Sequence, residues 1–545
     1  MSMNRRGFVR TAGLASVGAA VGSACSTDTG VPVRAVARDS ASTMLPAFAF
    51  EEMSVAEMQR LLTRGELTSR ALTQAYLDRI AAIDQAGPTL RAVIELNPEA
   101  LAIADQCDRE RREGPLKSPL HGIPVLIKDN LDSADRMQTT AGSLALVGKP
   151  APKDAAVVER LRAAGAILLG KTNLSEWANF RSTRSSSGWS SRGGQTRNPY
   201  VLDRNPCGSS SGTGAAIAAN LAPVGIGTET DGSIICPSAI CGLVGLKPTV
   251  GLVSRRGIIP ISSTQDTAGP MTRSVADAAA LLQVIVGSDP ADVATGAAPE
   301  APIDYLAGLR PDALKGARIG VARNLAGFHP AVDARFTEAL AALTALGAEL
   351  IDPCDVPNVD AYGAAETIVL QYEFKAGLNA YLASRGDTVA HHTLAELITW
   401  NRAHATEVMP HFGQEQFEQS EARGPLTDAE YLEALATCRL QARTKGIDAL
   451  FAQHRLDALV APSNGPAWLT DHLNGDHFGG GNSAVAAVPG YPSLTVPMGF
   501  VGELPVGLSF IGVAWTEAKL LGYGHAFEQR MKARRAPRFL PTLPI

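Results

Sequence analysis

The chain alternates between stretches with helical periodicity and short apolar runs, and this alternation restricts its fold more than any other feature. Apolar residues recur at three- and four-residue spacings over 54–85, and 100–111 continues the helical pattern. Strand-like apolar runs follow at 123–127 and 166–170. Helices that alternate with buried strands indicate an α/β sheet. Further strands are predicted at 223–227, 317–322, 458–461, 493–496 and 508–511.

Composition and charge exclude several classes of function. The 545 residues are 45% hydrophobic and 19% charged, which is an ordinary globular composition with enough material for a core. The formal net charge of -5 provides no basic surface for nucleic acid. The composition suits an enzyme that acts on a small or neutral substrate.

The seven cysteines are scattered and form no CxxC pair. Their spacing therefore predicts neither a zinc site nor a dense disulfide framework, although one disulfide in an oxidising compartment is compatible with it. Cys236 and Cys241 have apolar neighbours, so we interpret both as small buried residues.

The first 25 residues have the pattern of an export signal. Arg5 and Arg6 are followed by Phe8, and an uncharged run of small and apolar residues covers 12–24. This pattern resembles a Tat-type signal peptide, and the apolar run is too short to span a bilayer. We expect export to the periplasm or beyond, with a possible lipid anchor at Cys25. Residues 26–45 are rich in Ser, Thr, Asp, Pro and Ala and are predicted to be a linker before a catalytic domain at 46–545.

Lys128 ends the apolar strand at 123–127, which is an unusual place for a lysine. Burial of an ammonium group is costly and lowers its pKa, so that a buried lysine can be neutral and accept a proton. The alternative is that Lys128 leaves the edge of the sheet and pairs with Asp129.

Two loops rich in glycine and serine follow. Residues 208–214 precede a predicted helix, but no lysine follows the last glycine, as a phosphate-binding P-loop requires. Ser233 comes directly after a tight turn at 230–232 and precedes apolar residues. A serine in such a turn can expose its hydroxyl to a cleft while neighbouring backbone N–H groups form an oxyanion hole. No histidine accompanies Ser233, which argues against a Ser-His-Asp triad.

Together these features resemble the amidase signature family. The core motifs are Lys128, the loop Gly208-Ser209-Ser210-Ser211-Gly212 and the turn Asp231-Gly232-Ser233. The resemblance extends over about 50–530, and its flanking motifs are Gly170-Lys171-Thr172-Asn173 with Glu176, Thr196-Arg197-Asn198-Pro199, Cys241-Gly242-Leu243-Val244-Gly245-Leu246-Lys247-Pro248-Thr249, Gln265-Asp266-Thr267-Ala268-Gly269-Pro270-Met271 and Leu504-Pro505-Val506-Gly507-Leu508.

The resemblance implies the amidase signature fold, in which helices cover both faces of a large mixed central β-sheet. It also implies a Ser-Ser-Lys triad: Ser233 attacks the amide and forms an acyl-enzyme, Ser209 follows a cis peptide bond and relays a proton, and neutral Lys128 is the base. The N–H groups of Thr230, Asp231, Gly232 and Ser233 are expected to form the oxyanion hole. No cofactor, metal or obligate partner is implied. Asp231 replaces a glycine of the family pattern, which puts the geometry of the oxyanion hole in doubt.

Within this family the chain is most similar to bacterial peptide amidases, which remove the C-terminal amide of peptides. The family also contains the glutaminase subunit of tRNA-dependent amidotransferases, and hydrolases of aryl, fatty or aliphatic amides are further alternatives. A non-catalytic exported binding protein with the same fold is a more remote one. The export signal disfavours the amidotransferase, which is a cytoplasmic complex.

Overall fold

The computed structural model describes residues 47–301 and 303–544. These residues belong to a single compact unit. The predicted signal at 1–25, including Cys25, and the predicted linker at 26–45 lie outside the described residues. The domain boundaries therefore remain predictions.

A mixed sheet of eleven strands forms the centre of the described unit, in the order β1-β3-β2-β6-β8-β7-β12-β13-β11-β9-β10. The neighbours β3, β2 and β6 are parallel, as are β11, β9 and β10, and the pairs between these two groups are antiparallel. The strands are β1 (Val93–Leu96), β2 (Pro124–Lys128), β3 (Ile167–Thr172), β6 (Val224–Glu229), β7 (Val244–Lys247), β8 (Thr267–Thr272), β9 (Arg318–Val321), β10 (Glu349–Ile351), β11 (Ala458–Pro462), β12 (Ser493–Val501) and β13 (Leu504–Ile511), with a separate two-stranded sheet of β4 (Trp189–Ser190) and β5 (Gly194–Gln195).

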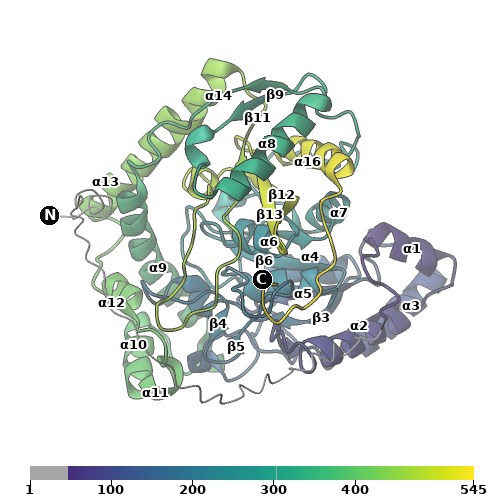
Figure 1. Cartoon of the computed structure of the whole chain (residues 1–545). Helices are drawn as coiled ribbons and strands as arrows, with labels where there is room; N and C mark the ends of the chain where they lie inside the picture. The colour runs from purple at the N-terminus through teal and green to yellow at the C-terminus, as the bar shows by residue number, and fades with distance from the viewer. Residues whose placement is uncertain (1–46, 302, 545) are drawn as a thin grey trace, which may run out of the picture. The chain divides into compact units, whose positions relative to one another are not determined.

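Helices surround this sheet (Figure 1). The α-helices are α1 (Val55–Thr63), α2 (Ser69–Ile83), α3 (Ala100–Glu113), α4 (Ala156–Ala163), α5 (Ser211–Ala218), α6 (Ile235–Ile240), α7 (Val275–Ile285), α8 (Pro330–Ala345), α9 (Gly363–Arg385), α10 (Leu394–Ala403), α11 (Ala405–Val408), α12 (Glu415–Glu421), α13 (Ala429–Cys438), α14 (Asp448–His454), α15 (Ala484–Ala487) and α16 (Glu517–Met531). The remaining helical segments are η1 (Leu144–Leu146), η2 (Glu176–Asn179), η3 (Val293–Ala297), η4 (Arg323–Leu325), η5 (Gly386–Thr388) and the π-helical η6 (Arg439–Ile447).

The alternation of side chains along β12 shows that helices cover both faces of the sheet. A Cβ at Gly524 of α16 would contact Leu494 and Val496, so these two side chains point toward α16. The intervening Thr495 lies beside Gly507 on the other face, where Gly507 approaches Ala239 of α6. Successive residues of a strand point to opposite faces, so α16 and α6 lie on opposite sides. The predicted fold class, a mixed sheet with helices on both faces, is confirmed.

Local signals explain where the first helices begin. Ser54 and Glu57 form a reciprocal capping box at the start of α1, which satisfies backbone N–H groups that have no partner within the helix. The helical pattern predicted over 54–85 divides into α1 and α2, because Gly65 adopts a φ of 70° between them. Thr68 caps α2, and its side chain accepts a hydrogen bond from the Ala71 N–H.

Helices α9 to α13, from the middle of the chain, lie together at one side of the sheet (Figure 1). Along 429–454 the helical path is divided into α13, the π-helical η6 and α14. Gly446 departs from helical φ/ψ inside η6, which interrupts the regular pattern.

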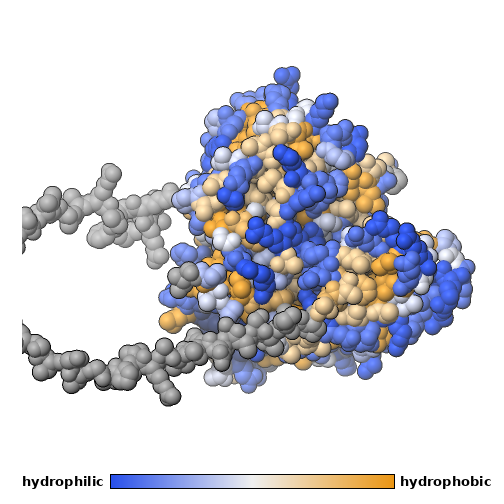
Figure 2. Space-filling view, turned by 45° about the vertical axis from the view of Figure 1, so that its right-hand side comes forward, coloured by the Kyte–Doolittle hydropathy of each residue, from blue (hydrophilic) through white to orange (hydrophobic). Residues whose placement is uncertain are grey.

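The described surface is mixed in polarity. On the face shown in Figure 2, hydrophilic residues are spread throughout and hydrophobic residues form small patches between them. Within the described ranges, the helices are all too short or too polar to cross a membrane.

Candidate active site

Lys128 is the last residue of β2, and its side chain is completely buried. Its Nζ lies 2.8 Å from Ser209 Oγ and 2.8 Å from Thr228 Oγ1, and 3.3 Å from the Thr228 carbonyl oxygen. The parallel pairing of β2 with β6 brings Thr228 to this position. Asp129 contacts Thr140 and Arg192 instead, so the alternative of an ion pair between Lys128 and Asp129 is wrong.

Burial makes the amine of Lys128 a feasible base. Desolvation lowers its pKa to about 7, because the charged form loses its hydration and only Asp266 and Glu229 compensate through their charges. A lysine of this kind is largely neutral slightly above pH 7 and has a lone pair for a proton.

Ser209 lies in the loop before α5, in the position that the sequence predicted. The Gly208–Ser209 peptide bond is cis. A side chain at residue 208 would have no room, because a Cβ there would lie 2.2 Å from Ser175 Oγ. Ser211 Oγ donates to the Cys207 carbonyl at 2.6 Å, and Ser210 Oγ donates to the Thr228 carbonyl at 3.0 Å. The loop is thus fixed on both sides of Ser209.

Ser233 follows the turn at the end of β6. Glu229 Oε2 accepts hydrogen bonds from the N–H groups of Ile234 and Ile235, at 2.7 and 2.9 Å, and so holds the turn against its own strand. The Ser210 N–H donates to the Ser233 carbonyl at 3.2 Å, which joins the two serine loops. The hydrogen bond between the side chains of Ser233 and Ser209 that the triad requires remains a prediction.

The turn at 230–233 leaves its backbone N–H groups free. None of these four groups has a backbone or side-chain acceptor among the described residues. Gly232 has a φ of 79°, where only glycine is unstrained, whereas Asp231 is not among the described residues with positive φ. The replacement of a glycine by Asp231 therefore causes no backbone strain, and an oxyanion hole made by these N–H groups remains compatible with the turn.

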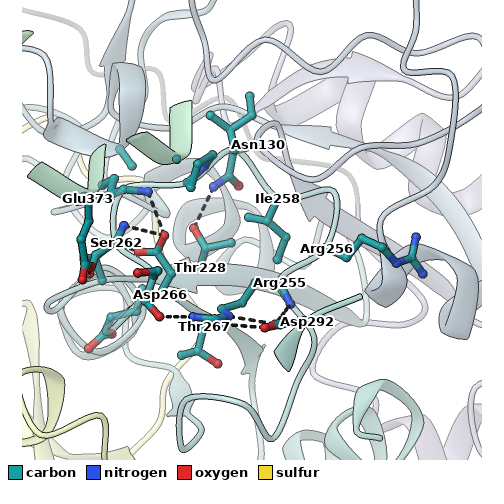
Figure 3. A pocket seen from close by; sticks show the side chains of 18 of the residues that line it. Asn130, Thr228, Arg255, Arg256, Ile258, Ser262, Asp266, Thr267, Asp292 and Glu373 are labelled. Atoms are coloured by element: carbon teal, nitrogen blue, oxygen red, sulfur yellow. Dashed lines mark hydrogen bonds and ion pairs between the residues drawn. The ribbon is translucent and has the colours of Figure 1, made fainter. Parts of the chain in front are cut away.

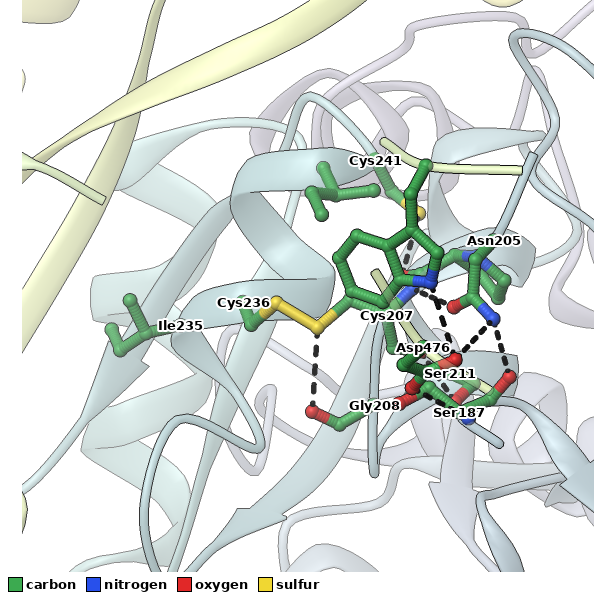
Figure 4. Close-up of a disulfide and its surroundings, with 12 residues drawn as sticks. Ser187, Asn205, Cys207, Gly208, Ser211, Ile235, Cys236, Cys241 and Asp476 are labelled. Carbon is green, nitrogen blue, oxygen red and sulfur yellow. Dashed lines mark hydrogen bonds between the residues drawn. A yellow bond between two sulfur atoms is a disulfide. The ribbon is translucent and has the colours of Figure 1, made fainter. Parts of the chain in front are cut away.

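A disulfide connects the two loops. Cys207 precedes Ser209 by two residues, Cys236 follows Ser233 by three, and the two cysteines are bonded to each other (Figure 4). Cys236 is buried, as predicted, but it is also disulfide-bonded; the pairing depends on a contact across 29 residues that spacing does not show. Cys241 is a free buried thiol, as predicted.

A cleft of about 290 Å³ opens beside these loops, and we call it the catalytic cleft. It is lined by Gly208, which precedes Ser209, and by Asp231 and Gly232, which precede Ser233. Its opposite wall comes from a distant part of the chain and includes Asn464, Trp468, Asp476, Phe478 and Ser483. No motif in the sequence predicted this wall. The only signal available was the glycine-rich segment at 475–481, which interrupts the strand pattern.

Comparisons with known proteins identify the family. The amidase family model matches residues 71–521. The chain belongs to the amidase family. An amidase-family protein of Arabidopsis thaliana is 40% identical over 503 residues, which cover 90% of this chain and 93% of the relative. This amidase is therefore an amide-hydrolysing enzyme, and a Ser-Ser-Lys triad is typical of its family.

Two further relatives bear on the substrate. The native peptide amidase from Stenotrophomonas maltophilia matches with a TM-score of 0.87 and 54% identity, over 90% of this chain and 100% of that one. A glutamyl-tRNA(Gln) amidotransferase subunit from Symbiobacterium thermophilum is 36% identical over 496 residues, covering 89% of this chain and 98% of the relative. Similarity to a bacterial peptide amidase is thus confirmed, and the family also includes amidotransferase subunits.

The amidase has a buried pair of acids beside its oxyanion turn. The buried carboxyl groups of Asp231 and Glu366 of α9 are neighbours, and the charge of Asp231 acts on Glu366. Desolvation and the charge of Asp231 raise the pKa of Glu366 to about 8. Gln265 Nε2 donates to Glu366 Oε1 at 2.9 Å. Glu366 therefore holds a proton at neutral pH.

One cluster in the described amidase has residue types that bind metals. The side chains of Cys107, Glu110 and His121 converge within 4.8 Å. His121 Nδ1 accepts from the Lys117 N–H at 3.4 Å, so Nε2 carries the hydrogen, and it lies 3.3 Å from Glu110 Oε2. Lys117 Nζ lies 2.8 Å from the same carboxylate. These contacts indicate an ion pair between Lys117 and Glu110 with His121 packed beside it, rather than a metal site.

Proposed function

We propose that this amidase hydrolyses the unsubstituted C-terminal carboxamide of peptides and releases ammonia. The observation that carries the chemistry is the 2.8 Å contact between the buried Lys128 Nζ and Ser209 Oγ, at a lysine whose pKa lies near neutrality. Similarity to a peptide amidase over 90% of the chain supports the substrate class.

In the proposed acylation step, Ser233 Oγ forms a bond to the amide carbon. Its proton passes to Ser209 Oγ while the Ser209 proton passes to the lone pair of Lys128 Nζ. The carbonyl oxygen becomes an oxyanion that accepts hydrogen bonds from the N–H groups of residues 230–233. The C–N bond then breaks, and the proton returns from Lys128 through Ser209 to the departing nitrogen, which leaves as ammonia.

Deacylation follows the same path in the proposal. A water molecule donates its proton through Ser209 to Lys128 and attacks the ester on Ser233. Collapse of the second tetrahedral intermediate returns the proton to Ser233 Oγ and releases the peptide with a free carboxylate. The relay makes Lys128 a base in each half-reaction and an acid in the step that follows.

The catalytic cleft supports a substrate with an extended acyl part. Trp468 and Asp476 line both the cleft and an adjoining cavity of about 620 Å³. A peptide whose carboxamide lies at the oxyanion turn has room to continue along this second cavity. A glutaminase activity is the second candidate, because amidotransferase subunits are 36–38% identical to the chain.

A substrate panel tests the proposal. Ammonia release is measured from a peptide amide, free glutamine, an aryl amide and a long-chain fatty amide, with Ser233→Ala as the inactive reference. Rapid release from the peptide amide, with internal peptide bonds intact, supports the proposal. Activity confined to glutamine or to aryl or fatty amides would retain the amidase chemistry and refute the substrate class.

We further propose export of the enzyme by a Tat-type signal to the periplasm or beyond. The twin residues Arg5 and Arg6 support this, and a disulfide is typical of an oxidising compartment. Replacement of both arginines by lysine should retain the protein in the cytoplasm, as measured by cell fractionation. Equal export of this variant would contradict a Tat signal. Labelling with a radioactive fatty acid tests lipidation of Cys25.

A further inference from the structure

A separate cavity of about 410 Å³ is lined by residues 228–230, next to the oxyanion turn, and we call it the rear pocket. Asn130 and Thr228, which share a hydrogen bond, are among its lining residues (Figure 3). Thr230, the loop at 258–263 and Ala376 of α9 also line it. A volume of this size is within the range of small-molecule sites in proteins.

The rear pocket and the catalytic cleft share a wall. Ala178 and Thr230 line the rear pocket, whereas their chain neighbours Asn179 and Asp231 line the catalytic cleft. Trp177, Ala178 and Asn179 all have positive φ, at 52°, 53° and 70°. Non-glycine residues in this conformation store backbone strain, which commonly occurs at functional sites. Residues of this strained segment and of the turn that carries Ser233 thus line the same two cavities.

Among the described residues, the rear pocket is lined by hydrogen-bond acceptors that have no partner. Isoleucine, alanine and proline side chains form much of its lining. Asn130 Oδ1 and Glu229 Oε1 are buried and have no hydrogen-bond partner among the described residues, and both residues line the pocket. No unpartnered donor of a described lining residue accompanies them. Buried polar atoms are normally paired, so these two acceptors favour a ligand that brings N–H groups.

The charges around the rear pocket also favour a cation. Glu229, Asp266 and Glu373 line it, and none of the three forms an ion pair with a described residue. The two arginines of the lining are already paired: Arg255 with Asp292, and Arg256 with residues outside the pocket. The remaining field is negative, which attracts ammonium groups and repels carboxylates.

We propose that the rear pocket is a second binding site, for small primary amines that carry an apolar body and are cationic at neutral pH. The ammonium group would meet Asn130 Oδ1 and Glu229 Oε1, and the apolar body would lie among Ile258, Ile259 and Ile261. This site is distinct from the proposed peptide site and does not depend on the identity of the amide substrate.

A ligand in the rear pocket would affect catalysis without blocking the catalytic cleft. Asn130 Nδ2 donates to Thr228 Oγ1 at 3.0 Å, and the same oxygen lies 2.8 Å from Lys128 Nζ. An ammonium group bound to Asn130 is therefore separated from Lys128 by two hydrogen bonds. Inhibition by such an amine should lower kcat and leave KM for the amide substrate nearly unchanged.

Benzylamine is a suitable probe, with benzyl alcohol and benzoate as matched compounds of similar size. Calorimetric titration of the whole enzyme should show saturable binding of benzylamine, and binding of the other two should be at least roughly tenfold weaker, as expected for a charge-assisted hydrogen bond. Ala376→Trp should fill the pocket from an exposed position of α9 and abolish binding, while amide turnover is retained. Ala380→Trp, at an exposed residue one turn later on the same helix, is the control and should bind normally.

Several outcomes would overturn the proposal. Equal affinity for benzylamine and benzyl alcohol would contradict the role of the acceptors and carboxylates. Unchanged binding to Ala376→Trp would place the amine elsewhere, and inhibition that is strictly competitive with the amide would place it in the catalytic cleft. If Ala376→Trp proved unstable, Leu426→Trp at the half-exposed rim of the pocket provides the same test.

Discussion

Lys128 Nζ and Ser209 Oγ lie 2.8 Å apart although 81 residues separate them in the chain. Lys128 ends one strand of the sheet and Ser209 precedes α5, which packs across that strand and its neighbours. The contact is completely buried at both ends, so water does not compete for either atom. This pairing is the part of the site on which the proposed proton relay depends.

Replacement of Ser209 should reveal the relay. Ser209→Ala removes the hydroxyl between the nucleophile and Lys128, and we expect kcat/KM for a peptide amide to fall by roughly 10³ or more, as for other members of catalytic triads. Ser210→Ala is the matched control, because the Ser210 hydroxyl donates to the Thr228 carbonyl and not to Lys128. Equal losses in the two variants, both well folded by circular dichroism, would argue against a specific role for Ser209.

The activity should depend on pH through Lys128. Burial lowers the pKa of this lysine to about 7, so the neutral base predominates above that pH and the protonated, inactive form below it. We therefore expect kcat/KM to fall about tenfold per unit as the pH decreases below 7. Steady-state rates of ammonia release across this range provide the measurement.

The decrease of kcat/KM at acidic pH should be absent when Lys128 is replaced. Lys128→Met keeps a similar length and removes the amine, so its residual activity should be low and nearly independent of pH in this range. A wild-type profile that stays flat from acid to alkaline pH would be inconsistent with a neutral lysine as the base.

Reduction of the Cys207–Cys236 disulfide should impair the enzyme. The bond closes a loop with a separation of 29 residues, for which chain entropy predicts a contribution of about 3–4 kcal/mol to the free energy of unfolding. We expect the double variant Cys207→Ser/Cys236→Ser to unfold at a lower temperature. Its kcat should fall more than its KM rises, because the bond joins the loops of Ser209 and Ser233.

Cys241→Ser is the control for this experiment, since Cys241 is a free buried thiol near the disulfide (Figure 4). Burial raises the pKa of this thiol far above its usual range, which makes it a poor partner for thiol exchange. Full activity of the double variant at unchanged stability would show that the disulfide has no positioning role.

The buried pair of Asp231 and Glu366 should make stability depend on pH. The pKa of Glu366 is raised from 4.5 to about 8, so the folded state holds a proton that the unfolded state releases, and stability is lost as the pH rises from about 4.5 through 8. The other titratable groups near Glu366 are Tyr362 and Cys438. Glu366→Gln imitates the protonated acid and should reduce the decrease of Tm over this range. An identical decrease in the variant would assign the effect to other groups.

The sequence predicted the parts of the fold that have strong local patterns. The strands β2, β3 and β11 are buried along their whole length, and they therefore stand out in the sequence as apolar runs. The strands β7 and β8 were not predicted as strands, because glycine and proline in these segments weaken the strand pattern. Their burial between neighbouring strands overrides that local preference.

The residues of the candidate site were predictable where they lie in short sequence motifs. Lys128 is conspicuous as a lysine at the end of an apolar strand, and the serine loops have characteristic glycines. The disulfide partner of Cys236, the carboxyl partner of Asp231 and the wall formed by Trp468 and Asp476 were not predictable in this way. Each depends on contacts between distant segments, which only the assembled sheet brings together.

The two walls of the catalytic cleft come from distant parts of the chain, so each can change in evolution without the other. The reacting groups all lie within 128–233, whereas the facing wall comes from 464–483. Substitutions in the second segment can alter which acyl groups are accepted while the first segment stays unchanged. Natural variation, or recombination between relatives, could therefore produce new substrate preferences by exchanging a stretch of about twenty residues around an inherited chemical centre.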